Sequence, residues 1–294
     1  AKPRAAQAAI GTTVDPVLLE IFNNLFMAIA EQMGVTLANT AYSVNIKERL
    51  DFSCALFDAD GNLIANAPHM PVHLGSMGES VRSIIRDNKA RPRGICAGDA
   101  YMLNDPYRGG THLPDITVIT PVFDTAGTRL LFYVGSRGHH ADIGGITPSS
   151  FCMAAENAYE EGILIPPVKI VEAGHIRRDI EELYLRASRK PEAVALDFRA
   201  QLAGNTTAKE RIETLLNRYG PDVVKAVMRK ILNDGEQAFL EKMSRLPDGT
   251  WRDRTYVECS RPGDRKTHRV QLTLHKRGNS LIFENDGTAE QDGA

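Results

Sequence analysis

The amino-acid sequence predicts an α+β fold with mixed or antiparallel sheets and long helices. Strand-like and helical segments are segregated along the 294 residues, whereas a doubly wound fold requires them to alternate. Hydrophobic residues make up 43% of the chain and charged residues 24%, which is the composition of an ordinary globular protein. These observations indicate packed layers of helix and sheet, and they exclude a disordered chain, a collagen-like repeat and a disulfide-dense miniprotein.

The first predicted element is a long amphipathic helix from Asp15 to about Asn39. Aspartate is a good N-cap, the following proline suits the first helical position, and apolar residues then recur at three- and four-residue steps. A β-hairpin is predicted next, because an Asp-Gly pair at 60–61 separates two short apolar runs, 52–57 and 62–67.

The middle of the chain predicts one helix, one strand and a second hairpin. The helix at 78–87 has its apolar residues on one side, and the strand at 98–103 leads into a polar loop. Two β-rich apolar runs, 116–123 and 129–135, are joined by a four-residue turn and form the second hairpin. The segment 136–162 is polar and glycine-rich, so we expect an active-site or contact loop there.

The last third predicts helices followed by strands. Helical patterns fill 179–188, 191–218 and 222–246, and strands return at 255–260, 269–276 and 280–284. We expect four regions: a flexible lead-in over 1–14, an α+β domain over 15–178, a helical region over 179–250, and the start of a β-rich region over 251–294. The final strand and turn suggest a truncated β-rich region, so we expect an N-terminal portion of a larger chain.

Charge and cysteine usage limit the partners. The net charge is −2, from 35 basic and 37 acidic residues, which gives no electrostatic signature of nucleic-acid binding. The run 86–93 is locally basic, and we expect it to be a solvated surface. The apolar stretches are too short or too polar to cross a bilayer. Four cysteines stand far apart, and no signal peptide opens the sequence, so we expect free thiols and a cytoplasmic location.

Two polar loops hold the histidines that are best placed for chemistry. His112 and Asp115 are separated by two residues in one loop, and His139, His140 and Asp142 stand together in the next. Imidazole nitrogens and carboxylate oxygens at such spacing predict a divalent transition metal, and they do not distinguish Zn, Mn and Fe. Neighbours in an extended backbone point in opposite directions, so only one of the two adjacent histidines is expected to be a ligand. Ordinary hydrogen bonding is the alternative for each of these residues.

Three further residues are ambiguous. His69 and His73 lie in a segment with two prolines, which predicts an extended loop, and substrate contact or loop hydrogen bonding rather than a helical ligand pair. Asp51, just before the first hairpin strand, is either a ligand or part of an ordinary turn or ion pair. The sequence has no Gly-x-x-x-x-Gly-Lys-Ser/Thr phosphate loop and no Gly-x-Ser-x-Gly elbow.

Five motifs occur in one order along the chain: ERLDFSCAL (48–56), HMPVHLGSM (69–77), NDPYRGGTHLPD (104–115), GHHADIGG (138–145) and EGILIPPVK (161–169). Through them the chain resembles the hydantoinase B family, the B-type subunits or halves of N-methylhydantoinase and 5-oxoprolinase. The same module is used in acetone and acetophenone carboxylases. Family members are generally much longer than this sequence. The segment 149–153 departs from the small Gly-Ser-Met turn that is common in the family, which leaves the substrate open.

The resemblance implies one component of a hetero-oligomeric enzyme. An A-type partner would bind ATP with Mg and phosphorylate an oxygen of a cyclic amide, such as a hydantoin, 5-oxoproline or another lactam. The B-type chain would then open the ring with a metal-activated hydroxide. A subunit of an ATP-dependent ketone carboxylase and a non-catalytic scaffold subunit are the alternatives.

The resemblance also implies roles for individual residues, all within the α+β domain. The metal ligands would be Asp51, His112, Asp115 and His139. His140 and Asp142 would orient ligands or relay a proton, and Arg108 would hold a phosphate or a substrate carboxylate.

Overall fold

The computed structural model describes residues 15–67, 69–89, 91–148, 152, 154–258, 263 and 265–290. The lead-in expected over 1–14 and residues 259–260 of a predicted strand lie outside the described residues. Contacts divide the chain into two compact units, 1–144 with 163–231, and 145–162 with 232–294. The boundaries expected near residues 178 and 250 stay predictions.

The first unit is built on a seven-stranded sheet in the order β2-β1-β5-β4-β3-β6-β7, with every neighbouring pair antiparallel. Its strands are β1 (Phe52–Asp58), β2 (Leu63–Asn66), β3 (Ala100–Leu103), β4 (Asp115–Phe123), β5 (Leu130–His139), β6 (Val168–Glu172) and β7 (His175–Ile176). Its helices are α1 (Pro16–Thr40), α2 (Val44–Lys47), α3 (Pro71–Lys89), η1 (Pro106–Arg108), α5 (Arg178–Ala187) and α6 (Pro191–Tyr219). The α+β class and the antiparallel sheet are confirmed.

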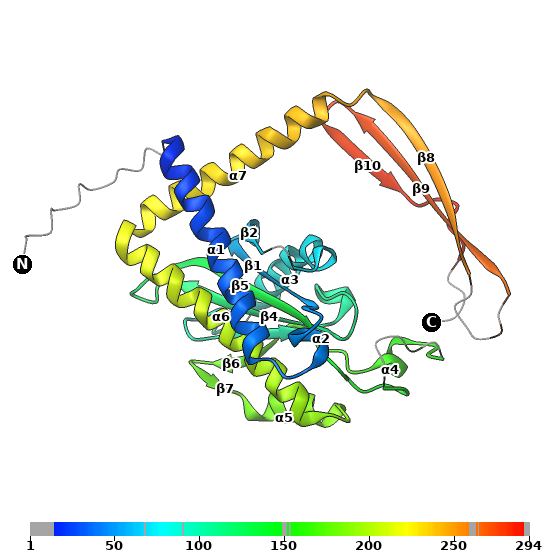
Figure 1. Ribbon diagram of the computed structural model, residues 1–294, viewed down its shortest axis with the longest axis horizontal. Helices are drawn as coiled ribbons and strands as arrows, with labels where there is room; N and C mark the ends of the chain where they lie inside the picture. Colours follow the sequence, from blue (N-terminus) through cyan, green and yellow to red (C-terminus); the bar gives the residue numbers. More distant parts are fainter. Residues whose placement is uncertain are drawn as a thin grey trace, which may run out of the picture. The chain divides into compact units, whose positions relative to one another are not determined.

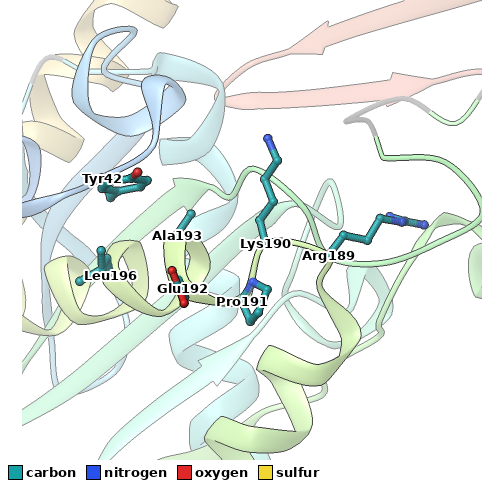
Figure 2. A pocket seen from close by; sticks show the side chains of 7 residues that line it. All are labelled: Tyr42, Arg189, Lys190, Pro191, Glu192, Ala193 and Leu196. Carbon is teal, nitrogen blue, oxygen red and sulfur yellow. The ribbon is translucent and has the colours of Figure 1, made fainter.

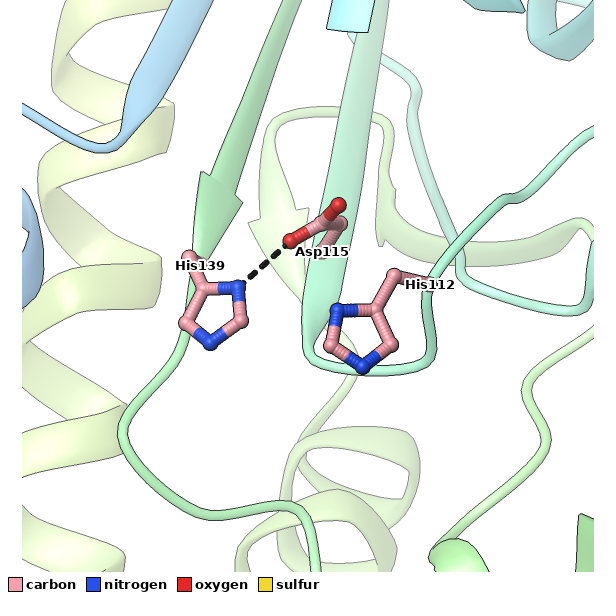
Figure 3. Close-up of side chains that lie close together, drawn as sticks. All are labelled: His112, Asp115 and His139. Carbon is pink, nitrogen blue, oxygen red and sulfur yellow. Dashed lines mark hydrogen bonds and ion pairs between the residues drawn. The ribbon is translucent and has the colours of Figure 1, made fainter. Parts of the chain in front are cut away.

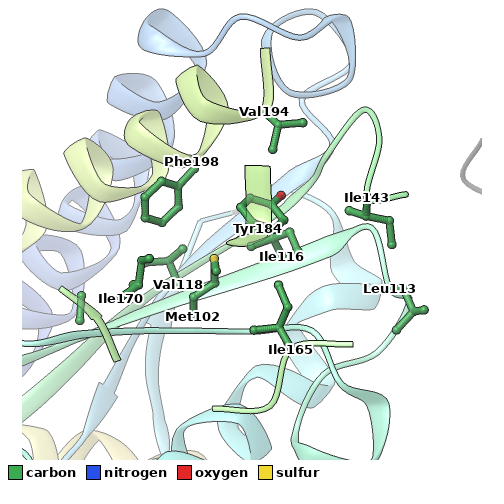
Figure 4. Close-up of a cluster of buried hydrophobic side chains, with 11 residues drawn as sticks. Met102, Leu113, Ile116, Val118, Ile143, Ile165, Ile170, Tyr184, Val194 and Phe198 are labelled. Atoms are coloured by element: carbon green, nitrogen blue, oxygen red, sulfur yellow. The ribbon is translucent and has the colours of Figure 1, made fainter. Parts of the chain in front are cut away.

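Helices cover both faces of this sheet (Figure 1). On one face α3 packs against β1, β4 and β5, and on the other α1 and α6 lie side by side across the sheet. Two buried clusters follow the alternation of the strands. The cluster on the α3 face consists of Ala55, Phe57, Met77, Val81, Ile84, Tyr101, Leu103, Ile119 and Tyr133. The cluster under α5 and α6 includes Met102, Ile116, Val118, Tyr184 and Phe198 (Figure 4).

The helix starts show how local sequence sets the elements. The side chain of Asp15 accepts a hydrogen bond from the backbone N–H of Leu18, as expected for an N-cap. The helix expected at 78–87 instead begins at Pro71, so the extended loop predicted there is wrong from Pro71 onward. Proline fits the first helical position because the N–H that it lacks has no intrahelical partner there.

The second correction concerns the loop expected from Ser136. Residues 136–139 continue β5, paired with β1 on one side and β4 on the other. Glycines at 135 and 138 obscure the strand pattern in the sequence, but in the sheet they leave room for large neighbours. A Cβ at Gly135 would lie 2.6 Å from a methyl carbon of Ile119.

The second unit contains α4 (Ala158–Glu161), part of α7 (Pro221–Ser244) and a three-stranded antiparallel sheet in the order β10-β9-β8. The strands are β8 (Gly249–Glu258), β9 (Thr267–Arg277) and β10 (Ser280–Glu284). Across the described residues, each helix is too short or too polar to serve as a membrane span.

Phe26 of α1 should be a main contributor to the stability of the first unit. Its side chain is fully buried and its ring packs 5.9 Å from that of Phe132 on β5. We expect Phe26→Ala to lower the free energy of unfolding in urea by about 3–5 kcal/mol, because it leaves a cavity between helix and sheet. Met27, the next residue, is 39% exposed. Met27→Ala should change stability by less than about 0.5 kcal/mol, and equal effects would contradict this packing.

Candidate functional site

The register of three adjacent strands places the site residues in rows on the α3 face of the sheet. Asp115 on β4 pairs directly with His139 on β5. On the other side of β5, the backbone N–H of His139 donates to the carbonyl of Asp51, 3.0 Å away, just before β1 begins. Three predicted ligands, distant in sequence, therefore lie side by side at one end of the strands.

His112 reaches this row from the loop that precedes β4. The backbone N–H of Asp115 donates to the carbonyl of His112 at 2.9 Å, which closes a tight turn. Buried Asn104 braces the loop, with its amide nitrogen donating to the carbonyls of Leu113 and Ile163 at 2.8 Å each. Gly110 packs so closely on Asn104 that a Cβ would lie 2.0 Å from its carbonyl oxygen. The loop therefore requires glycine at position 110, two residues before His112.

Three side chains form a cluster that can hold a metal ion (Figure 3). One ligand atom from each of His112, Asp115 and His139 lies within 4.8 Å of the other two. The Nδ1 of His139 donates to the carboxylate of Asp115 at 2.7 Å, and the rings of His112 and His139 are 5.4 Å apart. Two nitrogens and one oxygen suit Zn, Mn or Fe, so the donor set fits the predicted ion.

Asp51 and His73 border this cluster. The carboxylate of Asp51 lies 4.0 Å from the Nδ1 of His139 and 3.9 Å from the Nε2 of His73. His73 in the first turn of α3 is buried, and its Nε2 lies 3.4 Å from the Asp115 carboxylate. The sequence predicted an extended loop at His73 and therefore did not predict this contact. The contact forms because α3 begins at Pro71.

The Asp115 carboxylate is strongly favoured in its ionised form. Burial alone would raise its pKa, but the hydrogen bonds and electrostatic interactions with His139 and His73 outweigh burial. Together they hold the pKa of Asp115 well below its usual range. The carboxylate is therefore ready to bind a cation at neutral pH.

His140 lies on the opposite face of the sheet from His139, as strand alternation predicts. It is buried, with hydrogen bonds to the hydroxyl of Tyr184 at 2.7 Å and the amide oxygen of Gln201 at 2.9 Å. Burial is the main reason that its pKa is lowered. Its backbone N–H donates to the carbonyl of Pro114, next to Asp115. This placement fits an orienting role, which stays a prediction.

Asp142 and Arg108 lie outside the cluster. Buried Asp142 accepts hydrogen bonds from Ser188 and Arg189, so it ties its loop to the connection between α5 and α6. The exposed guanidinium of Arg108 pairs with Asp87 on α3 at 2.5 Å. The predicted contact of Arg108 with a substrate anion stays a prediction.

His69 also lies away from the cluster, with its ring 4.5 Å from that of Phe52, and burial lowers its pKa. A hollow of about 580 Å³ lies beside the start of α6 (Figure 2). Its lining contains none of the seven predicted site residues, and it consists of Tyr42, Arg189, Lys190, Pro191, Glu192, Ala193 and Leu196. Among the residues that the structure describes, neither place has three His, Cys, Asp or Glu side chains close enough to hold a metal ion.

Sequence reasoning missed Arg137, which lies on β5 two residues before His139 and is fully buried. It belongs to the second row of the same three strands, between Ser53 on β1 and Thr117 on β4. The signal in the sequence was an arginine that follows a run of apolar or small residues, 130–136.

The sequence pattern of the family described as "Hydantoinase B/oxoprolinase" matches residues 15–294. The chain is 38% identical over 281 residues to the 5-oxoprolinase of Dictyostelium discoideum, and the match covers 95% of this chain and 22% of the relative. The chain thus spans about a fifth of that relative's length. The resemblance inferred from the five motifs is confirmed.

Two solved structures share the fold. The ATP-dependent caprolactamase of Pseudomonas jessenii superposes with a TM-score of 0.84 at 28% identity, over 92% of this chain and 46% of that one. An acetone carboxylase in its nucleotide-free form superposes with a TM-score of 0.83 at 21% identity, over 93% of this chain and 37% of that one. The second likeness establishes the fold alone.

The three-residue cluster predicts a metal content that depends on Asp115. We expect the purified protein to contain roughly one divalent transition metal per chain, and Asp115→Asn to reduce this to a small fraction, because the amide has no charge. Elemental analysis of the folded variants measures the content. Asp124→Asn, at the exposed turn at the other end of the same hairpin, is the control. Equal metal content in Asp115→Asn and Asp124→Asn would contradict the assignment of Asp115 as a metal ligand.

Proposed function

Because the chain belongs to the hydantoinase B/oxoprolinase family, we propose that it is the metal-bearing part of an ATP-dependent hydrolase that opens a cyclic amide. The substrate would be a hydantoin, 5-oxoproline or another lactam. The supporting relatives are named 5-oxoprolinase and ATP-dependent caprolactamase, and each acts, by its name, on such a ring. The single observation that carries the proposal is the cluster of His112, Asp115 and His139.

The four predicted ligands do not lie equally close to the proposed ion site. His112, Asp115 and His139 supply the nitrogen and oxygen donors, and Asp51 lies at the edge of the set, 4.0 Å from His139. A divalent ion bound there would act as a Lewis acid toward the amide or activate a water molecule at neutral pH. The low pKa of Asp115 keeps its carboxylate charged, so the donors need no rearrangement of protons at that residue.

The neighbouring residues keep these donors in place. His73 contacts the second oxygen of Asp115, and the backbone N–H of His140 donates to the carbonyl of Pro114. Each bond restrains one side of the turn that carries the ligands. Such outer contacts typically determine how well a site holds its ion.

ATP would be bound, with Mg, by an A-type partner subunit that phosphorylates an oxygen of the ring. An amide carbon is a poor electrophile, and phosphorylating its oxygen makes that oxygen a good leaving group. The absence of a recognisable phosphate loop in the sequence supports this division of labour. We propose a hetero-oligomer, and a cytoplasmic location fits the free thiols of Cys54, Cys96 and Cys152.

The alternative is a subunit of an ATP-dependent ketone carboxylase, in which the same ligands would stabilise an enolate. The support for this alternative is weaker, because this chain is 21% identical to the acetone carboxylase and 38% identical to the 5-oxoprolinase.

The proposal is tested by substrate consumption in the complete complex with the partner subunit. We expect ATP-dependent opening of a hydantoin, 5-oxoproline or a larger lactam, and loss of that activity to background in His112→Ala. His175→Ala, on the exposed hairpin of β6 and β7, should retain full activity. Bicarbonate-dependent consumption of acetophenone would instead favour the carboxylase. Full activity in His112→Ala would leave only a scaffold role.

A further inference from the structure

Arg137 is the one charged residue in the middle of the β5 strand, and its side chain is fully buried. All five of its N–H donors have partners. The Nε donates to the hydroxyl of Thr117 at 2.7 Å. The two terminal nitrogens donate to four oxygens, which are the carbonyls of His73 and Gly109 and the hydroxyls of Ser76 and Ser80. A fully satisfied guanidinium at this depth fixes every group that it contacts.

These five acceptors belong to the elements that carry the metal cluster. Thr117 follows Asp115 by two residues on β4. Gly109 belongs to the same loop as His112, and the hydroxyl of Ser80 also donates to the carbonyl of Gly109. His73, in the first turn of α3, contacts Asp115 directly. Arg137 itself precedes His139 by two residues on the same face of β5, so one side chain joins β4, β5, α3 and the His112 loop.

Burying a charged side chain such as that of Arg137 costs free energy, so its presence at this position requires a physical explanation. Burial lowers its pKa to about 10, so the guanidinium is still protonated at neutral pH. None of its five hydrogen-bond acceptors is a carboxylate, and the negative charge that acts on it is that of Asp115. Apolar residues usually fill such an interior position at a lower free-energy cost than a buried ion. What a guanidinium adds is the fixed geometry of five donors.

We propose that Arg137 is the positioning residue of the metal site. It holds Asp115, the His112 loop and the first turn of α3 in the arrangement in which they accept a divalent ion beside His139. The inference rests on the metal site of the proposed function, and it adds a residue whose action is on the ligands and not on the substrate.

Two serines of α3 provide a matched test. Ser80 and Ser83 are both buried on the same helix, but only the hydroxyl of Ser80 bonds to Arg137 and Gly109. The full-length protein in its native complex is stripped with a chelator and titrated with cobalt(II). We expect Ser80→Ala to weaken cobalt binding by about tenfold and to shift the visible absorption bands, since outer contacts typically contribute 10–100-fold to metal affinity. Ser83→Ala should match the wild type in both measurements.

Arg137→Lys extends the test, because lysine keeps the charge but has three donors instead of five. Its cobalt affinity should fall at least as far as in Ser80→Ala, with altered bands, in protein that unfolds cooperatively. Wild-type bands and affinity in both Ser80→Ala and Arg137→Lys would overturn the positioning role, and so would equal losses in Ser80→Ala and Ser83→Ala. Absence of cobalt binding in the wild-type protein would instead contradict the metal site of the proposed function, on which this inference rests.

Discussion

The register of β5 against its two neighbours holds the candidate site together. Hydrogen bonding places Asp51, His139 and Asp115 in one row across the ends of β1, β5 and β4. A slip of one residue in β5 would turn His139 to the α6 face and bring His140 to the site, because strand side chains alternate. His140 is held on its own face by Tyr184 and Gln201, so both faces of the strand oppose such a slip.

The side chains of the next two rows along these strands differ in polarity from the first row. The second row contains Ser53, Arg137 and Thr117, and the third contains Ala55, Gly135 and Ile119. The candidate ligands thus lie next to a polar layer, and that layer lies next to the apolar core under α3. A polar layer of this kind can orient charged ligands, whereas apolar side chains could only pack against them. Candidate ligands, polar side chains and apolar side chains thus follow one another in three rows along the same strands.

The proposed division of labour with an ATP-binding partner agrees with this architecture. The described cluster offers donors for a cation. The ligands come from two strand ends and one tight turn, all of which are braced by buried polar side chains such as Asn104 and Arg137. Candidate ligands held in this way can keep their geometry before and during substrate binding.

The sequence by itself determined the fold class, both hairpins, the long helices and the residue types of the site. Those features depend on periodicity, turn chemistry and short motifs, which are local. The motif His-x-x-Asp selected His112 and Asp115 as candidates, and the pair of adjacent histidines left His139 and His140 open. The choice of His139 came from the resemblance to the family. The start of α3 at Pro71 and the end of β5 at His139 were missed, because proline and glycine have the same local signature in loops, helix starts and crowded strands.

Only the tertiary structure decided which of these residues meet. His73 and Arg137 join the site through contacts across more than forty positions of sequence, and no local pattern contains such contacts. Pairing between strands determines which side chains share a row, and helix packing determines which backbone carbonyls face a buried guanidinium. Those choices follow from the burial of the whole sheet between its helices, so residue types alone could nominate the ligands but could not show what holds them.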